Sequence, residues 1–237
     1  MALCCLISAG CGTTKEARTV TPSGFLGSYS GLHPGGDSLP LLVYGNPTAD
    51  CRRYDKIMLD PVTLWARGEH SPFAKLSPGD RRILASQAQQ RLTDMATRAG
   101  YSLVDRPGPG VMRIRIAITE AEKADVALKD ASIIAPYVGG AAIAWSEFKG
   151  QAAFTGGAAI EAEIVDALTG ERLYAMVDKR VGTLDIRNTD KLDDIDSAFD
   201  EWRDRGIARL KTCRATGSFV PKAGETNLEQ TIESYRP

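Results

Sequence analysis

Residues 157–166 read Gly-Ala-Ala-Ile-Glu-Ala-Glu-Ile-Val-Asp, and residues 171–181 read Glu-Arg-Leu-Tyr-Ala-Met-Val-Asp-Lys-Arg-Val. Apolar and polar side chains tend to alternate in both runs, and a period of two residues is typical of β-strands. The four residues between the runs end in Gly170, which can adopt the positive φ that a tight turn requires. The two runs therefore predict a β-hairpin.

The segments before and after the hairpin predict further strands and two long helices. The first helix is expected to begin with Ser77 as its N-cap and to end at Gly100, and the second covers residues 190–213. Strands are expected at residues 54–65, 101–104 and 111–118. Pro61 should interrupt the first of these strands, because proline cannot donate a ladder hydrogen bond. This order predicts an α+β, or α/β, fold, in which a mixed sheet of four to five strands carries the two helices packed on one face.

The N-terminus is typical of a bacterial lipoprotein signal. A short apolar run ends in Ser8, Ala9 and Gly10, which suit the narrow cleft of a signal peptidase, and Cys11 follows them. We predict that residues 1–10 are a signal peptide and that the Cys11 thiol carries a diacylglycerol. The other interpretation is a buried apolar strand with ordinary core cysteines.

The residues after the lipidation site predict a tether and a location. Residues 12–24 are polar and lack apolar periodicity, and we therefore expect a flexible, lipid-anchored tether over residues 11–36. Gly12 occupies the position at which an aspartate would favour retention in the inner membrane. We therefore expect the lipid to anchor the protein in the outer membrane, with the folded domain facing the periplasm. The folded domain is predicted to span residues 37–215, and residues 216–237 are predicted to be a flexible tail.

Cys51 and Cys213 are the two cysteines outside the N-terminal group. An even pair in an oxidising compartment is a candidate disulfide, which would join the start of the domain to its last helix and stabilise it by about 4 kcal/mol. The alternative is two unrelated thiols that lie too far apart to bond, and the spacing alone does not decide between the two.

The composition fits one folded domain in water and argues against several functions. The chain has 237 residues, of which 43% are hydrophobic and 25% charged, with a formal net charge of −1. The near-neutral charge argues against nucleic acid as a partner, and no run approaches the roughly 18 apolar residues of a membrane span. Two histidines and the absence of a C-x-x-C spacing predict no metal site, and we expect no cofactor.

Two carboxylates, Glu161 and Glu163, lie on one face of the first hairpin strand. Acid–base chemistry would be open to them if they lined a cleft. The interpretation that we favour is a pair of solvated charges, matched by Lys179 or Arg180 on the neighbouring strand. We therefore predict no catalytic residues and no enzymatic activity.

The run at residues 133–145 is too apolar for a solvated loop and too interrupted by proline and glycine for an ordinary core element. We expect it to contact another envelope protein or a second copy of the chain, and the alternative is a buried crossover against the sheet. The candidate contact residues are Ile133, Ile134, Tyr137, Val138, Ile143, Trp145 and Phe148.

The function that we favour from the sequence is a non-enzymatic interaction or assembly module of the cell envelope, and the alternative is a periplasmic domain that binds a lipid or another small ligand. The sheet and the two helices would then enclose a pocket lined by Ile114, Ile116, Ile160 and Ile164. A plain hydrophobic core has the same alternating pattern, so both interpretations stay open.

Several short stretches of the sequence resemble those of the DUF3313 family of bacterial lipoproteins. They are Ser23–Tyr29, Tyr54–Val62, Pro107–Thr119, Gly157–Gly170 and Val177–Arg180, and they occur in the family's order. The resemblance implies an envelope lipoprotein whose lipid-bearing cysteine corresponds to Cys11. It implies no catalytic residues, because none is established for the family.

Overall fold

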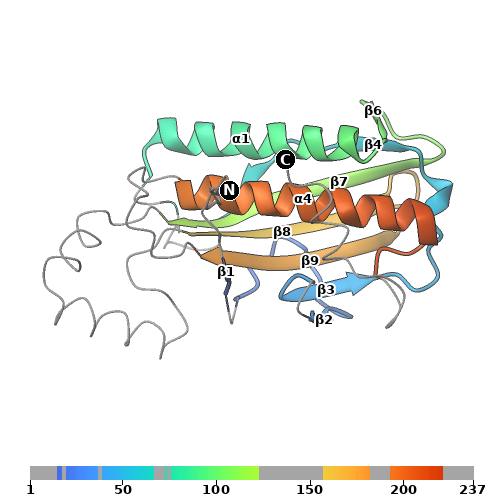
Figure 1. Ribbon diagram of the computed structural model, residues 1–237, viewed down its shortest axis with the longest axis horizontal. Coiled ribbons are helices and arrows are strands. Elements are labelled where there is room, and N and C mark those ends of the chain that lie inside the picture. The colour runs from blue at the N-terminus through green and yellow to red at the C-terminus, as the bar shows by residue number, and fades with distance from the viewer. Residues whose placement is uncertain are drawn as a thin grey trace, which may run out of the picture.

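The protein folds as a mixed β-sheet with two long helices on one face, as Figure 1 shows. The computed structural model describes residues 15–17, 20–36, 39–66, 73, 76–122, 157–181 and 193–220. Within this part of the chain the sheet has nine strands, of which seven follow the order β2-β3-β9-β8-β7-β4-β6. The α+β architecture agrees with the sequence, but the sheet is larger than the four to five strands predicted.

Three long antiparallel strands form the centre of the sheet: β7 (Val111–Glu122), β8 (Gly157–Asp166) and β9 (Arg172–Val181). The predicted hairpin is β8 and β9, and Gly170 in its turn has a φ of 73°. On the other side of β7, β4 (Lys56–Leu59) and β5 (Thr63–Leu64) are parallel to it, and β6 (Ser102–Val104) is parallel to β4. The predicted interruption at Pro61 is the gap between β4 and β5.

The strands that the sequence did not predict extend the opposite edge. They are β1 (Lys15–Glu16), β2 (His33–Pro34) and β3 (Leu42–Gly45). β1 and β3 both pair with β9, and β2 pairs with β3. Strands of two to four residues are too short to show a period, which is why the predicted sheet was too small.

The two helices lie side by side on the sheet (Figure 1). They are α1 (Pro78–Arg98) and α4 (Asp193–Thr216). As predicted, Ser77 caps α1: its hydroxyl accepts from the Asp80 N–H at 3.1 Å, and the Asp80 carboxylate accepts from the Ser77 N–H at 3.2 Å. The helices approach closely at Gly206, where a Cβ would lie 2.2 Å from the Met95 sulfur.

Residues 20–32 lie on the face of the sheet opposite the helices, and residues 33–34 form β2, so the prediction of a flexible tether through residue 36 was wrong for this segment. Leu26 is buried against Ala175 and Val177 of β9, and Phe25 and Leu32 add to the same apolar cluster. These apolar residues are spaced too irregularly to indicate a strand or a helix, and therefore the segment looked like a linker. Residues 11–14 lie outside the described part of the chain.

The C-terminal boundary also differs from the expectation. The predicted tail began at residue 216, but α4 ends at Thr216 and Phe219 behind it is buried in the core beside Tyr174. The folded part therefore includes residues 216–220. The rest of the predicted tail, residues 221–237, is not described.

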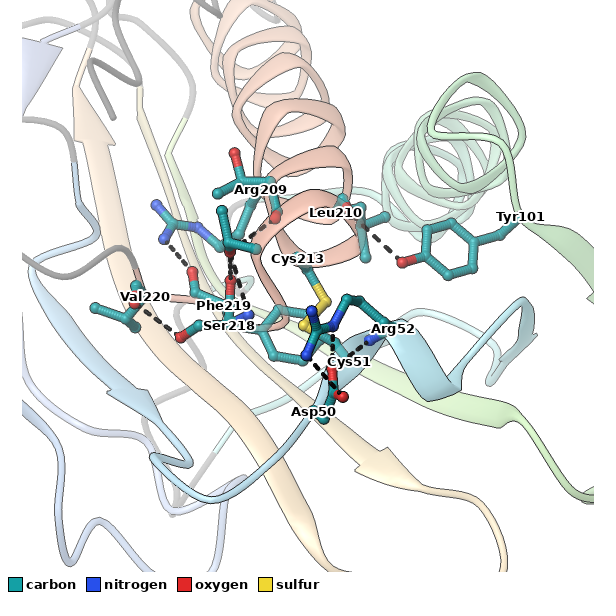
Figure 2. Close-up of a disulfide and its surroundings, with 12 residues drawn as sticks. Asp50, Cys51, Arg52, Tyr101, Arg209, Leu210, Cys213, Ser218, Phe219 and Val220 are labelled. Carbon is teal, nitrogen blue, oxygen red and sulfur yellow. Dashed lines mark hydrogen bonds and ion pairs between the residues drawn. A yellow bond between two sulfur atoms is a disulfide. The ribbon is translucent and has the colours of Figure 1, made fainter. Parts of the chain in front are cut away.

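Cys51 and Cys213 form a disulfide, which Figure 2 shows between the short 3-10 helix η1 (Cys51–Arg53) and α4. Their Cα atoms are 5.6 Å apart and their positions differ by 162 residues. Both side chains are fully buried. The bond joins the start of the central sheet to the last helix, so the alternative of two separate thiols does not hold.

Candidate functional site

An apolar cavity of about 120 Å³ lies between the helix pair and the sheet. Its floor includes Ile114, Ile116, Ile160 and Ile164, the four side chains that the sequence placed in a pocket. Leu92 of α1 lies among the side chains that cover it. Because β7 and β8 are antiparallel and in register, Ile114 faces Ile164, which brings the four isoleucines together on one face.

Small side chains leave room for the cavity. Ala162 lies between Ile160 and Ile164 on β8, and Ala88 lines the cavity from α1. A larger aliphatic side chain, such as leucine, at either position would extend into this space, because both alanines line the cavity. The sequence did not single out either alanine.

Arg209 of α4 also lines the cavity, although its side chain is almost completely buried, with 6% of the residue exposed. Its Nη1 donates to the Phe219 carbonyl at 2.9 Å, as Figure 2 shows, and its guanidinium lies 5.5 Å from the centre of the Tyr174 ring. Among the described residues, no carboxylate forms an ion pair with Arg209. A buried cation thus faces an apolar cavity with no matching charge among the described residues.

The other arginines of the lining are matched by acids. Arg91 lies 2.9 Å from Asp200, and Arg203 lies 2.8 Å from both Asp200 and Asp204. Arg205 lies 2.7 Å from Glu201. The Nη1 of Arg205 is nevertheless buried with no acceptor in the part of the chain that the structure describes.

Asp178 of β9 is the one acidic side chain among the described lining residues. Its carboxylate accepts from the Trp202 indole N–H at 2.7 Å and from the Leu41 N–H at 3.3 Å, and lies 3.5 Å from the Arg180 Nε. The aspartate is therefore already bonded on both oxygens. Close by, burial raises the pKa of the Tyr174 hydroxyl, so this side chain stays neutral at physiological pH.

Glu161 lies on the opposite face of β8 and is fully buried, so the prediction of a solvated charge was wrong. Its carboxylate accepts hydrogen bonds from the Ser23 N–H, from the Leu26 N–H at 3.4 Å and from the Tyr29 hydroxyl at 2.5 Å. Burial, with the hydrogen bond to Glu161, raises the pKa of Tyr29. The carboxylate holds the N-terminal segment on the sheet rather than reaching a cleft.

Glu163, two residues further along β8, is also buried. It pairs with Arg115 of β7 and with Arg172 of β9, the latter at 2.9 Å. Arg172 in turn donates to the carbonyls of Leu26 at 2.8 Å and Ser28 at 2.7 Å. The predicted partners were wrong, because Lys179 pairs with Glu120 and Arg180 lies on the helix side of the sheet, near Asp178.

Several predicted features fall on residues that the structure does not describe. Cys11 and all of the predicted contact residues between Ile133 and Phe148 lie outside the described residues. Within the described part, no group of three or more histidine, cysteine, aspartate or glutamate side chains could hold a metal ion. Neither α1 nor α4 is apolar enough over its length to cross a bilayer.

The fold and the site define an α+β domain with an apolar cavity between its sheet and a helix pair. The chain belongs to the DUF3313 family, described as a protein of unknown function, whose model matches residues 21–205. No curated protein matches the chain.

Two solved structures are similar over a large part of the chain. A single-residue variant of the PelC dodecamer from Paraburkholderia phytofirmans has 11% sequence identity and a TM-score of 0.38, and the match covers 70% of this chain and 93% of that one. The PelC dodecamer from the same organism in another crystal form has 12% identity and a TM-score of 0.37, with 70% and 94% covered.

Proposed function

We propose that this protein is a lipoprotein of the cell envelope, anchored by a lipid on Cys11 in the outer membrane and facing the periplasm, whose domain binds a small ligand. The observation that carries the ligand-binding function is the cavity floored by Ile114, Ile116, Ile160 and Ile164. A concave apolar space with a few polar groups at fixed places is typical of ligand sites. The function includes no catalytic step.

The size of the cavity sets the size of the ligand. Pockets for drug-sized ligands begin at roughly 300 Å³, whereas a dry apolar cavity of about 150 Å³ holds one benzene molecule. At about 120 Å³ this cavity belongs with the second kind. The bound apolar group therefore has about six carbon atoms, which is far smaller than a whole lipid.

The disulfide supports the location in the envelope. Disulfides persist in oxidising compartments such as the periplasm and are rare in a reducing cytosol. The Cys51–Cys213 bond joins two elements of the core that are 162 residues apart in the chain. A stabilising disulfide fits a domain that is exported to an oxidising compartment, and export agrees with the lipoprotein signal at residues 1–11.

Native mass spectrometry of the full chain, purified without denaturation, tests the ligand-binding function. We expect a bound small molecule that is lost in Ala162→Leu, because the larger side chain fills the cavity. Ala85→Leu is the matched control, since Ala85 is on α1 and does not line the cavity. A ligand-free protein that forms a discrete oligomer would overturn the proposal and favour an interaction module instead.

Cell fractionation tests the anchor separately. The wild-type protein should be found with the outer membrane, with an intact mass that includes acyl chains. Cys11→Ala should move it to the soluble periplasmic fraction. An unchanged mass and membrane association in Cys11→Ala would contradict lipidation at this residue.

A further inference from the structure

Among the described residues that line the cavity, Arg209 is the arginine without an ion pair to a carboxylate. Burial of an ionised group without a counter-charge is strongly unfavourable, and for this reason buried charges are normally paired. Arg209 is 6% exposed, and its described polar contact is a neutral one, the Phe219 carbonyl. The Tyr174 ring offsets part of the cost through a cation–π contact. An anion in the cavity would supply the missing charge.

A second donor lies one helical turn away. Arg205 and Arg209 are four residues apart on α4, so their side chains share one face of the helix, and both line the cavity. The Nη1 of Arg205 is buried, and no described residue accepts its hydrogen bond. The two side chains together therefore offer donors that the described part of the protein does not use.

Among the described residues, the acids near these donors neither reach the Nη1 of Arg205 nor pair with Arg209. Glu201 lies against the other side of the Arg205 guanidinium, with a 2.7 Å contact to its Nε. Asp178 is held by the Trp202 indole and the Leu41 N–H. An arriving anion would therefore not need to break an ion pair of Arg209.

We infer that the cavity takes a small amphipathic carboxylate. Its apolar part, about the size of a benzene ring, lies among the isoleucines, and its carboxylate accepts hydrogen bonds from Arg209 and Arg205. The planar fork of a guanidinium matches a carboxylate, and charge-assisted bonds in an apolar setting are about twice as strong as neutral ones. This inference rests on the proposed function, because it names the ligand class of the same cavity.

Calorimetric titration of the full chain with matched probes tests it. Benzoate and hexanoate carry the charge, benzyl alcohol and hexan-1-ol have the same carbon skeletons without it, and acetate has the charge without the apolar part. We expect each of the two larger carboxylates to bind at least tenfold more tightly than its alcohol, and acetate not to bind measurably.

The variant Arg209→Met should weaken benzoate binding at least tenfold and remove the preference for benzoate over benzyl alcohol, because the charge that distinguishes the two probes is gone. Arg214→Met is a close control, because Arg214 is also on α4, donates to the Gly100 carbonyl and lies 4.9 Å from the Tyr101 ring, but does not line the cavity. This control variant should bind both probes as the wild type does.

The outcomes separate the inference from the function on which it rests. Equal affinities of the wild type for benzoate and benzyl alcohol would overturn the inference and leave ligand binding standing. No binding of any probe, together with a ligand-free mass spectrum, would overturn both. If Arg209→Met fails to fold in a thermal melt, the comparison of acids and alcohols on the wild type still decides the question.

Discussion

Reduction of the Cys51–Cys213 disulfide should lower the free energy of unfolding by about 5 kcal/mol at 25 °C. The two cysteines are 162 residues apart. In the chain-entropy model, loss of such a cross-link raises the conformational entropy of the unfolded chain, which stabilises the unfolded state by this amount. Domains are stable by only about 5–15 kcal/mol in total. The bond therefore contributes a large share of the stability, even though it touches a small part of the structure.

Urea unfolding followed by tryptophan fluorescence, with and without a phosphine reductant, measures this effect. The midpoint should fall on reduction, and the slope of free energy against urea should rise, because the reduced unfolded chain exposes more surface. The unfolded protein is reduced first and refolded, since both cysteines are fully buried in the native state.

The double variant Cys51→Ala/Cys213→Ala is the control, because reductant should not change its midpoint. A shift in this variant would show that the reductant acts on the protein in some way other than by breaking this bond. Equal midpoints for the oxidised and the fully reduced wild type, with the thiols counted, would refute the reasoning.

Three further predictions concern the two faces of the sheet and the turn between β8 and β9. Glu161→Gln should expose residues 20–32 to proteolysis or hydrogen exchange before the rest of the protein, because an amide replaces a carboxylate that accepts three hydrogen bonds, at a cost of about 2 kcal/mol; unchanged protection would contradict this. Burial raises the pKa of Asp166, but hydrogen bonds from its turn and from Tyr54 outweigh this and hold the pKa below its ordinary 3.8. The ionised carboxylate therefore stabilises the fold, and this stability should be lost as the pH falls through the pKa of the folded state. The urea midpoint of Asp166→Asn should fall less between pH 6 and pH 3 than that of the wild type. Gly206→Ala should lower the free energy of unfolding by about 1–3 kcal/mol, because its methyl group would overlap the Met95 sulfur, and a thermal melt that rises instead would show that the helices separate freely.

The elements with a long regular pattern were predictable from the sequence. The β8–β9 hairpin, the start of α1 at Ser77 and the interruption at Pro61 follow from local rules that need no knowledge of the rest of the chain. The facing isoleucines of the cavity followed from alternation alone. Alternation could not predict the cavity itself, because its volume depends on the distance of α1 and α4 from the sheet.

Features made by distant contacts were missed. Glu161 looked like a solvated charge, because its donors are 132 to 138 residues away in the chain. The segment that supplies them, residues 20–36, has no period of its own and gains its order from the sheet. For Arg209, the sequence showed a basic residue near the end of a helix, which helix dipoles favour, and gave no sign of a missing partner.

The pairing of β1 with the end of β9 limits how far this domain could stand from a membrane. Between Lys15 and a lipid on Cys11 the chain has four residue steps, which span at most about 14 Å even when fully extended. A protein anchored in this way would keep the Val181 end of its sheet almost at the lipid headgroups, without freedom to search the periplasm. Ligands and partners would have to come to the bilayer surface to meet it.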